Sequence, residues 1–493
     1  MDKKDLSKLQ NGSDIRGVAT EGAGEAVTLT EDAVFLITLA FVKFLSEKLK
    51  KDPKRMTIAV GHDSRISAPI LKNAVVAALI KSEVFPIDTG LSSTPAMFMA
   101  TQFDSVRADG AIMLTASHLP YQRNGMKFFT AEGGAEKEDI RKILEIASAA
   151  EEKYIHKDYE ADYAPLMTMY ARHLRGKIID ALGEDMPLDG MKIVIDAGNG
   201  AGGFFAYDVL IPLGAEIKGS VFLEPDGHFP NHIPNPEDKT AMAAIKKAVK
   251  NANADLGIIF DTDVDRMSAV LSNGEIINRN ALIAMMSAIL AKDYPQSTIV
   301  TDSVTSDELT DFLEGLGLKH HRFKRGYKNV INECKRLNES GVLSPLAIET
   351  SGHGALNENY YLDDGAYLAI KLIIAAARAK REGKDLSSLI ADLKYPLEEK
   401  EIRIKILTED FKNYGENALK IFERRAKESE IKIAAPSYEG VRLIFPHGFA
   451  LLRMSLHDPI LPLNMESRKA GGVDEILTAV KNLLNGFDKL SFK

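Results

Sequence analysis

Short apolar runs alternate with helical patterns along most of this chain. Each apolar run ends at polar or turn-forming residues, which is typical of buried strands. Helical patterns lie between the runs, as at residues 240–251 and 367–380. Alternating strands and helices predict an α/β protein with mixed or mostly parallel sheets. The predicted strands are at residues 57–60, 112–114, 192–195, 256–260, 298–301 and 346–348.

The pattern changes after residue 390. A long polar helix is predicted at residues 408–429 and a short strand at residues 441–445, which indicates a smaller α+β domain. A chain of 493 residues is also too long for a single hydrophobic core. The pattern has seams near residues 160, 276 and 390, and we therefore predict four domains. Their ranges are 1–160, 161–276, 277–390 and 391–493.

The hydrophobic content of 45% is ordinary for a globular enzyme. The longest apolar run, residues 33–42, is about half as long as a bilayer requires, and Thr38 interrupts it. Thr30, followed by Glu31 and Asp32, is typical of a helix start, so the run predicts a core helix. The first ten residues, MDKKDLSKLQ, lack the apolar core of an export signal. We therefore expect a cytoplasmic location and no membrane partner.

The charges and the single cysteine narrow the possible functions. The chain has 62 Lys and Arg and 70 Asp and Glu, a formal charge of −8, with no large basic block. This balance argues against nucleic acid as a partner but not against a phosphorylated substrate. Cys334 is the only cysteine, which excludes an internal disulfide and a cysteine-based metal site.

Residues 112–129, IMLTASHLPYQRNGMKFF, contain the first candidate for chemistry. The apolar strand ends in Thr115, Ala116, Ser117 and His118, and Lys127 follows ten residues after Ser117. A serine becomes a nucleophile or a phosphate carrier only with a proton acceptor and positive charge nearby. The alternative is an ordinary strand exit whose polar side chains bind only the backbone.

A second candidate is the stretch GIIFDTDVDR at residues 257–266. In an extended segment Asp261, Asp263 and Asp265 would point to one side, and Mg²⁺ would relieve their repulsion. An EF-hand is excluded, because its sixth position is Arg266 rather than Gly and its twelfth is Ser272 rather than Glu. A solvated acidic turn remains an alternative. So does a phosphatase of the haloacid-dehalogenase type with Asp261 as nucleophile, although that motif usually opens its domain.

A third candidate follows the strand at residues 346–348. Glu349, Ser351 and His353 lie in a predicted turn with Gly352 and Gly354. Glu and Ser can exchange hydrogen bonds with sugar hydroxyls, and His can move a proton. The alternative is a purely structural role for the histidine.

These three stretches resemble motifs of the α-D-phosphohexomutase superfamily. TASHLPYQRNGMKFF resembles its phosphoserine loop, DTDVDR its metal loop and ETSGH its sugar-binding loop. Further matches follow in family order and extend over essentially the whole chain. They are GSDIRG at 12–17, VGHDSR at 60–65, STP at 93–95, DAGNGAG at 196–202 and PDGHFPNHIPNPED at 225–238.

The resemblance implies three similar mixed α/β domains plus a C-terminal α+β domain around a central cleft. It implies the interconversion of hexose 1-phosphate and hexose 6-phosphate, with glucose or mannose as the sugar. A phosphoserine and a bound hexose 1,6-bisphosphate, which would also be the activator, would carry the phosphoryl group. One Mg²⁺ per chain is implied as the cofactor.

The resemblance also implies a role for each matching residue. Ser117 would carry the phosphoryl group and, with Asp261, Asp263 and Asp265, bind Mg²⁺. Lys127 would be the general base. The other implied roles are Arg266 as support for the phosphoserine region, Arg16 and His118 as pocket residues, Gly326 and Lys328 as residues that orient the sugar, Glu349 and Ser351 as ligands of its hydroxyls, and His353 as proton donor or acceptor.

The C-terminal phosphate loop departs from the family pattern R-x-S-G-T-E-P. Arg453, Ser455 and Pro459 keep their places, but Leu456 and His457 replace Gly and Thr. A phosphate cradle relies on backbone N–H groups with little side-chain obstruction, so Leu456 changes its geometry. We expect Arg453 and Ser455 to bind the phosphate that is not being transferred, with His457 in place of a hydroxyl donor. The alternative is a domain that binds phosphate weakly or differently.

Three further functions stay open at this stage. A phosphoglucosamine mutase would use the same E-x-S-G-H loop, because the loop binds hydroxyls common to the three sugars. The other two are the phosphatase with Asp261 as nucleophile and a phosphosugar-binding protein without turnover. The sequence does not indicate an oligomeric state.

Overall fold

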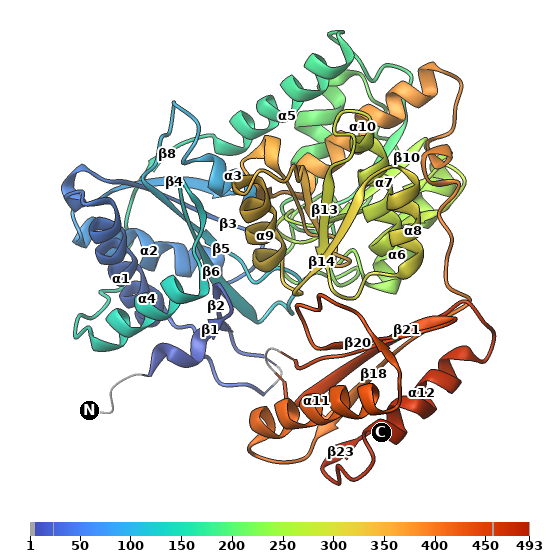
Figure 1. Ribbon diagram of the computed structural model, residues 1–493. Coiled ribbons are helices and arrows are strands. Elements are labelled where there is room, and N and C mark those ends of the chain that lie inside the picture. Colours follow the sequence, from blue (N-terminus) through green and yellow to red (C-terminus); the bar gives the residue numbers. More distant parts are fainter. Residues whose placement is uncertain (1–4, 23, 456–457, 493) are drawn as a thin grey trace. The chain divides into compact units, whose positions relative to one another are not determined.

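The computed structural model describes residues 5–22, 24–455 and 458–492. The chain divides into two compact units. Figure 1 shows their helices and strands, coloured by residue number. The first unit comprises Met1–Leu282 and Ser351–Ser388, and the second comprises Ile283–Thr350 and Leu389–Lys493. This division into two units does not test the four predicted domain ranges, which remain a prediction.

The first unit opens with a mixed sheet in the order β1-β2-β6-β5-β3-β4-β8, with β7 paired to β6. β3 is parallel to both β4 and β5, whereas β6 is antiparallel to β5 and β2. The strands and the short helices between them are η1 (Leu6–Leu9), β1 (Gln10–Asn11), β2 (Asp14–Val18), η2 (Pro53–Arg55), β3 (Thr57–His62), β4 (Phe85–Leu91), β5 (Gly110–Leu114), β6 (Arg123–Thr130), β7 (Gly133–Gly134) and β8 (Asp162–Tyr163).

Helices α1 (Glu31–Leu49), α2 (Ala68–Lys81) and α4 (Lys137–Ala149) share one hydrophobic core with alternate side chains of β3, β5 and β6. The short helix α3 (Thr94–Met99) contacts the same three strands. Every residue of β5 is buried, as expected for a strand with apolar groups on both faces. Thr30 caps α1, because its side chain accepts a hydrogen bond from the backbone N–H of Ala33.

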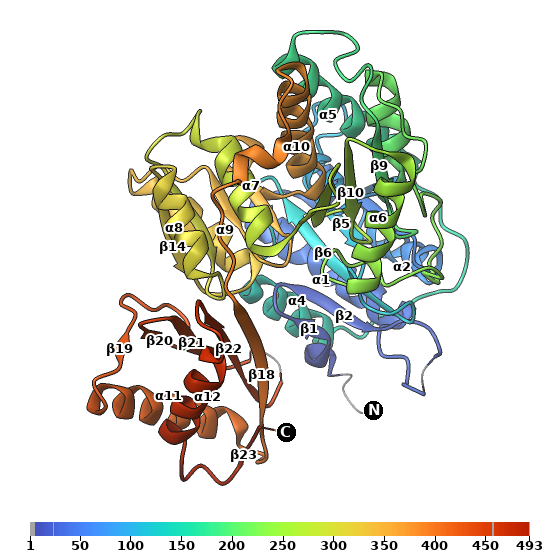
Figure 2. The ribbon, with the colours of Figure 1, turned by 90° about the vertical axis from the view of Figure 1, so that its right-hand side faces the viewer.

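A second sheet of the first unit has the order β12-β11-β10-β9. Its central strand β10 is wholly buried and ends at Phe260, directly before the acidic loop. Figure 2 gives a second view of α5, α6 and α10. The elements of this part are α5 (Leu166–Leu182), β9 (Ile193–Asp196), η3 (Phe205–Leu210), η4 (Ile211–Leu213), α6 (Lys239–Ala252), β10 (Leu256–Phe260), β11 (Met267–Leu271), β12 (Ile276–Ile277), β16 (Gly354–Leu356), η5 (Asn357–Asn359), β17 (Leu362–Asp363) and α10 (Gly365–Arg381).

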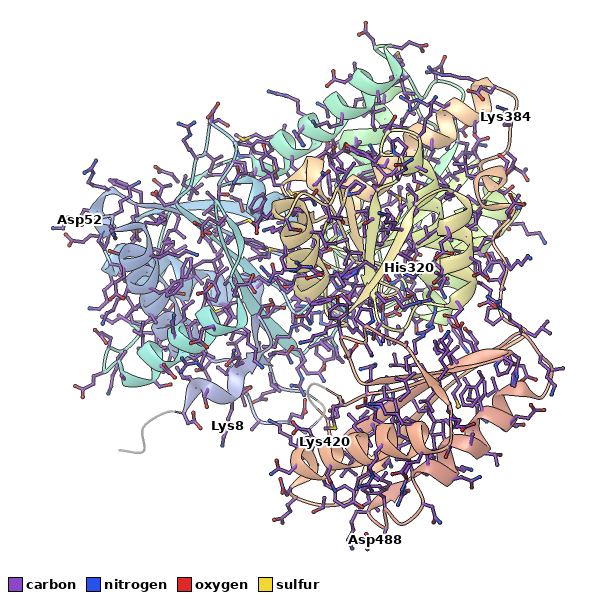
Figure 3. All side chains as sticks on the ribbon, viewed as in Figure 1. Lys8, Asp52, His320, Lys384, Lys420 and Asp488 are labelled. Carbon is purple, nitrogen blue, oxygen red and sulfur yellow. The ribbon has the colours of Figure 1, made fainter. Side chains whose placement is uncertain are left out.

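The second unit begins with parallel strands, in which β13 lies between β14 and β15. His320 of β14 (Figure 3) lies among threonine hydroxyls, and its Nε2 is 2.8 Å from Oγ1 of Thr301. The elements here are β13 (Thr298–Asp302), α8 (Asp307–Gly315), β14 (Lys319–Phe323), α9 (Tyr327–Glu339) and β15 (Leu346–Ile348). Two elements cross from one unit to the other, α7 (Arg279–Ala291) and η6 (Leu386–Ile390).

The C-terminal part of the second unit is an antiparallel sheet in the order β19-β20-β21-β22-β18-β23. Helices α11 and α12 lie along one side of this sheet and share its hydrophobic core (Figure 1). The elements are β18 (Glu398–Ile406), α11 (Phe411–Glu428), β19 (Lys432–Ile433), β20 (Val441–Phe445), β21 (Gly448–Leu452), β22 (Ile460–Ser467), α12 (Gly472–Leu483) and β23 (Leu490–Ser491).

The fold class predicted from the sequence, α/β sheets followed by a C-terminal α+β domain, is confirmed. The six predicted strands and the predicted helices occur, and their ends differ from the predicted ends by at most three residues. The exception is α1, which extends beyond the apolar run at residues 33–42. Among the described residues, we find no helix that combines the length and the apolar character needed to cross a membrane.

Candidate active site

Ser117 lies in a tight loop directly after β5. Its φ is +52°, a left-handed conformation that costs a non-glycine residue roughly 1–2 kcal/mol. The loop holds this conformation through a hydrogen bond from the Ser117 backbone N–H to Oγ1 of Thr115, at 3.0 Å. Thr115 in turn donates its hydroxyl to Oδ2 of Asp63, at 2.7 Å. Strain of this kind is common where a side chain must be presented for chemistry.

Arg65 supports the same loop through hydrogen bonds to its carbonyl groups. Its guanidinium donates to the carbonyl oxygens of Ser117, Leu119, Pro120 and Arg123, and it forms an ion pair with Asp63 at 3.2 Å. The side chain of Arg65 is fully buried. One guanidinium thus satisfies four carbonyl groups of the serine loop, which rigidifies it.

The hydroxyl of Ser117 meets groups that lie far away in the sequence. It donates to Oδ2 of Asp261 at 3.1 Å and accepts a hydrogen bond from Nη2 of Arg266 at 2.8 Å. Nδ1 of His118 lies 3.3 Å from the same oxygen. The structure therefore brings together four of the residues singled out by the sequence, with a carboxylate and a guanidinium on one serine oxygen.

His118 is an uncharged partner in this cluster. Burial, together with the positive charges of Arg266 and Arg16, lowers the pKa of His118 to about 3. Its Nδ1 is 2.7 Å from Nη2 of Arg266, which can only donate, so this nitrogen accepts. His118 therefore orients the guanidinium of Arg266 without adding positive charge.

The acidic loop is a turn, which corrects the extended geometry expected from the sequence. Val264 has a φ of +68°, and the backbone N–H of Arg266 donates to Oδ1 of Asp261 at 3.1 Å. Each carboxylate of Asp261, Asp263 and Asp265 nevertheless offers an oxygen, and these oxygens lie within 4.8 Å of one another. The three acids converge because the turn folds them inward, not because they alternate along a strand.

The three carboxylates are buried and repel one another. Burial and the charge of Asp265 raise the pKa of Asp261 and of Asp263. Burial acts the same way on Asp265, but the positive charges of Lys127 and His353 outweigh it and lower that pKa. In the described part of the chain, Oδ1 of Asp263 and Oδ1 of Asp265 are buried without a hydrogen-bond partner. This donor set fits a hard divalent cation with oxygen ligands.

Thr94 holds the far side of the acidic loop. Its backbone N–H donates to the carbonyl oxygen of Asp263 at 2.8 Å, and its hydroxyl hydrogen-bonds to the carboxylate of Asp263. Thr94 begins α3, and the side chain of Ser93 caps that helix. The loop is therefore fixed both at its backbone and at the side chain of Asp263.

Lys127 and Arg16 lie on neighbouring strands, β6 and β2. Nζ of Lys127 is 3.0 Å from Oδ2 of Asp265 and 3.7 Å from Oδ2 of Asp14. Nη2 of Arg16 is 3.0 Å from the same oxygen of Asp14. Burial opposes ionisation of Asp14, but the charges of Lys127 and Arg16 outweigh it and lower the pKa of Asp14. Asp14 thus connects Lys127 and Arg16, two positively charged side chains to which the sequence resemblance gave separate roles.

His353 lies directly before β16, two residues after Ser351, and faces two carboxylates. Its Nδ1 is 2.6 Å from Oδ2 of Asp363 and 3.7 Å from Oδ1 of Asp265. Burial favours the neutral ring, but Asp363 and Asp265 outweigh it and raise the pKa of His353 to about 9. The ring is therefore protonated at neutral pH, which suits a proton donor.

The other predicted residues belong to the second unit. The backbone N–H of Gly326 donates to Oε1 of the buried Glu349 at 2.6 Å, and Gly326 has a φ of +112°, which favours glycine. Lys328 lies in the first turn of α9. His457, like Leu456, lies outside the described residues.

Arg453 follows β21 and is only 6% exposed. Its Nη1 is 3.8 Å from Oε1 of Glu439, and its Nε is buried without a hydrogen-bond partner within the described residues. Oγ of Ser455 accepts from the backbone N–H of Asp458 at 3.2 Å. A buried guanidinium with an unused donor is suited to an anionic ligand.

Comparison with known families decides the relationship of this chain. Three models of phosphoglucomutase/phosphomannomutase α/β/α domains match it in succession, domain I at residues 7–154, domain II at 168–274 and domain III at 278–395. The chain belongs to the phosphoglucomutase/phosphomannomutase family. It is accordingly a phosphotransferase of the isomerase class.

Individual relatives agree with the family over nearly the full length. A phosphomannomutase/phosphoglucomutase of Pseudomonas aeruginosa is 30% identical over 483 residues, 96% of this chain and 95% of the relative. A phosphoglucomutase of Neisseria gonorrhoeae is 27% identical over 474 residues, 96% and 95% of the two chains. The fold is similar to that of a phosphoglucomutase/phosphomannomutase family protein from Burkholderia thailandensis, with a TM-score of 0.79, 24% identity and coverage of 99% and 98%.

Family membership argues against a phosphatase of the haloacid-dehalogenase type. The phosphoglucomutase/phosphomannomutase family is the one whose motifs the sequence resembled, and it is not the haloacid-dehalogenase type of phosphatase.

Sequence reasoning missed several residues that hold the site together. The only signal for most of them was their place inside a matching motif. These residues are Asp14, Asp63, Arg65, Thr94 and Asp363.

Proposed function

We propose that this mutase interconverts the 1-phosphates and 6-phosphates of glucose and mannose through a phosphoserine at Ser117. One observation carries the proposal. The Ser117 hydroxyl contacts Asp261 and Arg266, and the carboxylate of Asp261 belongs to the buried acidic trio. A serine with a guanidinium and a cation site beside it is equipped to carry a phosphoryl group.

Neighbouring residues support this role of Ser117, some as metal ligands and others as charge stabilisers. Ser117, Asp261, Asp263 and Asp265 would hold one Mg²⁺, since the three carboxylates converge, the Ser117 hydroxyl lies against Asp261, and within the described residues two carboxylate oxygens of the trio have no hydrogen-bond partner. When bound, the ion would neutralise the oxygen charge of the phosphoryl group. Arg266 would bind a phosphoryl oxygen on Ser117, and His118 would keep the guanidinium in place.

The proposed reaction consists of two transfers in opposite directions. In the first, the bond between phosphorus and the Ser117 oxygen breaks, a bond to O6 of hexose 1-phosphate forms, and the hydroxyl proton passes to a base. In the second, after the bisphosphate has reoriented, the Ser117 oxygen attacks the phosphorus on O1, the bond between that phosphorus and O1 breaks, and a proton passes to O1 to balance the one taken from O6. We assign the proton transfers to Lys127 as base and to His353 as donor, with Arg16 holding Asp14 against Lys127. The bisphosphate would also serve as the activator that loads Ser117.

Sugar and phosphate recognition are assigned to the remaining residues. Glu349 and Ser351 would bind sugar hydroxyls, and Gly326 and Lys328 would orient the ring. Arg453 and Ser455 would bind the phosphate that is not transferred, which agrees with the buried Nε of Arg453, which has no hydrogen-bond partner among the described residues. This division of roles agrees with a reaction whose catalysis is mostly positioning and charge neutralisation.

A direct assay tests the proposal. Glucose, mannose and glucosamine 1-phosphates are each incubated with the enzyme, Mg²⁺ and a trace of the matching 1,6-bisphosphate. We expect formation of the 6-phosphates of glucose and mannose, faster than that of glucosamine. Preference for glucosamine 1-phosphate would instead make the chain a phosphoglucosamine mutase. Release of inorganic phosphate without any 6-phosphate would contradict mutase activity altogether.

Asp263→Asn is expected to weaken Mg²⁺ binding. The substitution removes one ligand charge, and affinity for such cations depends on the number of ligand charges. The Mg²⁺ concentration at half-maximal activity should rise by roughly 10- to 100-fold, the range seen when even outer partners of a metal site are lost. Thermal unfolding gives an independent readout, because bound Mg²⁺ should raise the melting temperature of the wild type more than that of the variant.

Asp185→Asn is the matched control for the metal prediction, since Asp185 is exposed in the same unit. It should leave both readouts at their wild-type values. Unchanged Mg²⁺ dependence in Asp263→Asn would show that the acidic trio is purely structural.

Arg453→Lys is expected to raise KM more than it lowers kcat. A guanidinium grips two phosphate oxygens with parallel N–H groups, and an ammonium cannot reproduce this geometry. Loss of binding shared by ground state and transition state appears in KM, here by roughly tenfold. Steady-state kinetics with glucose 1-phosphate measure both constants. Arg424→Lys, on the exposed side of α11, is the control, and an unchanged KM in Arg453→Lys would refute the phosphate-binding role.

A further inference from the structure

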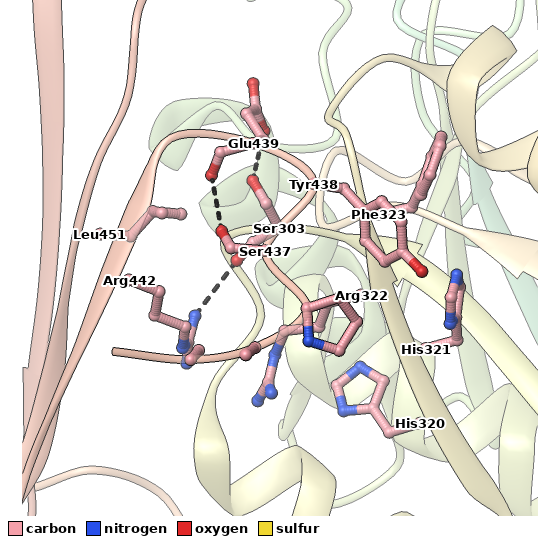
Figure 4. Close-up of a pocket in the computed structure, with 13 residues that line it drawn as sticks. Ser303, His320, His321, Arg322, Phe323, Ser437, Tyr438, Glu439, Arg442 and Leu451 are labelled. Atoms are coloured by element: carbon pink, nitrogen blue, oxygen red, sulfur yellow. Dashed lines mark hydrogen bonds between the residues drawn. The ribbon is translucent and has the colours of Figure 1, made fainter. Parts of the chain in front are cut away.

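Glu439, in the loop before β20, reaches the end of β13 in the same unit (Figure 4). One oxygen of its carboxylate, Oε2, accepts a hydrogen bond from the hydroxyl of Ser303 and another from the backbone N–H of Arg325 at 3.0 Å. The side chain of Glu439 is 12% exposed and lines a cavity of about 240 Å³. Nothing in the proposed mechanism uses this carboxylate.

The other oxygen of Glu439 faces the phosphate loop. Oε1 lies 3.8 Å from Nη1 of Arg453, within ion-pair range but too far for a good hydrogen bond. Burial lowers the pKa of Arg453, and the charge of Glu439 counteracts this. Glu439 therefore holds the guanidinium by charge rather than by a good hydrogen bond, and among the described residues Nε of Arg453 stays without a hydrogen-bond partner.

On its other side, Glu439 contacts backbone that leads to Glu349, the first residue of the predicted sugar-binding loop. Arg325 donates its N–H to Glu439, and the next N–H, of Gly326, goes to Glu349 at 2.6 Å. Two consecutive amides are thus held by carboxylates from different elements. A shift of Glu439 would move the peptide that carries the Gly326 contact to Glu349.

Arg442 strengthens the same attachment. Its Nη1 donates to the carbonyl oxygen of Ser303 at 3.2 Å, while Glu439 binds the hydroxyl of that serine (Figure 4). Residues 439 and 442 therefore hold Ser303 through both its side chain and its backbone. A contact made at two points fixes the loop before β20 and the start of that strand against the end of β13 more firmly than one hydrogen bond would.

We propose that Glu439 is a positioning residue that couples Arg453 to the Arg325–Gly326 peptide, so that phosphate and sugar are bound by loops already set relative to each other. The inference rests on the proposed function, because it assumes that both loops bind one phosphosugar. Without Glu439 each loop would have to be ordered on binding, which weakens affinity. Glu439 itself would touch neither the sugar nor the phosphate.

A double-mutant cycle tests the coupling. Calorimetry with glucose 1-phosphate gives the Kd of the wild type, Glu439→Gln, Arg453→Lys and the double variant. We expect each single change to raise Kd by roughly tenfold. The Kd of the double variant should be at most about twofold above that of the weaker-binding single variant. If the Kd of the double variant rose by the product of the two single factors, Glu439 would act independently of Arg453 and the inference would be wrong.

Amide hydrogen exchange tests the link to the sugar loop without any ligand. The Arg325 amide should exchange faster in Glu439→Gln than in the wild type, because the amide oxygen that replaces the carboxylate is a weaker acceptor. Ser303→Ala keeps the carboxylate and removes one donor, so its Kd should rise less than threefold and its Arg325 amide should stay protected. Equal exchange in Glu439→Gln and wild type would overturn the link. If Glu439→Gln does not fold, Glu439→Asp replaces it in both measurements.

The proposed function can fail separately from this inference. A wild type that binds glucose 1-phosphate but forms no 6-phosphate would contradict mutase activity, whereas the cycle and the exchange would still report on Glu439. Active wild type with additive losses and unchanged exchange would contradict the role of Glu439 alone.

Discussion

Ser117→Ala should abolish mutase turnover, with kcat falling by about a thousandfold or more. The Ser117 oxygen is the one contacted by Asp261 and Arg266 together, so its removal leaves the phosphoryl group without a carrier. The loop itself should stay folded, because Arg65 holds its carbonyl oxygens and Thr115 its backbone N–H. The coupled assay for glucose 6-phosphate measures the loss. Intact-protein mass gives a second readout, since the wild type incubated with glucose 1,6-bisphosphate should gain one phosphoryl group and the variant none.

Ser105→Ala is the matched control for this prediction. Ser105 is exposed in the same unit, and its replacement should change neither turnover nor phosphorylation. Substantial activity in Ser117→Ala would mean that another group carries the phosphoryl group, and the assignment would be wrong. Lost activity with normal phosphorylation of the variant would move the carrier elsewhere in the chain.

Arg65→Met should cause the largest loss of stability that we expect from a single substitution. It leaves the buried carboxylate of Asp63 without its ion-pair partner and four loop carbonyls without their donor. Removal of one partner of a buried pair costs roughly 3–5 kcal/mol. Burial already raises the pKa of Asp63 with Arg65 in place, so the uncompensated carboxylate would be still less favourable. Equilibrium denaturation measures the free energy of unfolding.

Two variants control for this prediction. Arg55→Met, at an exposed site, should leave the free energy of unfolding near its wild-type value. Asp63→Asn combined with Arg65→Met should recover part of the loss, because it removes the stranded charge. If Arg65→Met is as stable as Arg55→Met, the guanidinium network does not stabilise the serine loop in the way that the hydrogen bonds indicate.

The secondary structure was predictable because apolar periodicity reports which side chains must be buried. β10 is the clearest case, since five apolar or small residues in a row ended at an acidic loop, and all five are buried. The end of α1 was less predictable, because beyond Leu45, the last buried residue of the helix, it continues through polar residues to the exposed Leu49. Lys50 then adopts a left-handed conformation that ends the helix, although glycine is the usual residue there.

The acidic trio was predicted for a partly wrong reason. The residue types indicated a cation site, but the expected geometry was an extended strand. The turn with Val264 in a left-handed conformation depends on contacts from distant residues, among them the hydrogen bond from Thr94 to the backbone of Asp263. Such contacts leave no trace in the local pattern of residues 261–266.

The sequence by itself determined the order of strands and helices, the three polar loops and the kinds of side chain they offer, because burial and turn chemistry are local properties. Only the tertiary structure decided what each side chain does in company. His118 and His353 are the same residue type, yet burial beside Arg266 keeps the first neutral while Asp363 and Asp265 keep the second protonated. The physical reason is that protonation and hydrogen bonding depend on charges a few ångströms away, and folding brings some of those charges from distant parts of the chain, as it does for His118 and Arg266.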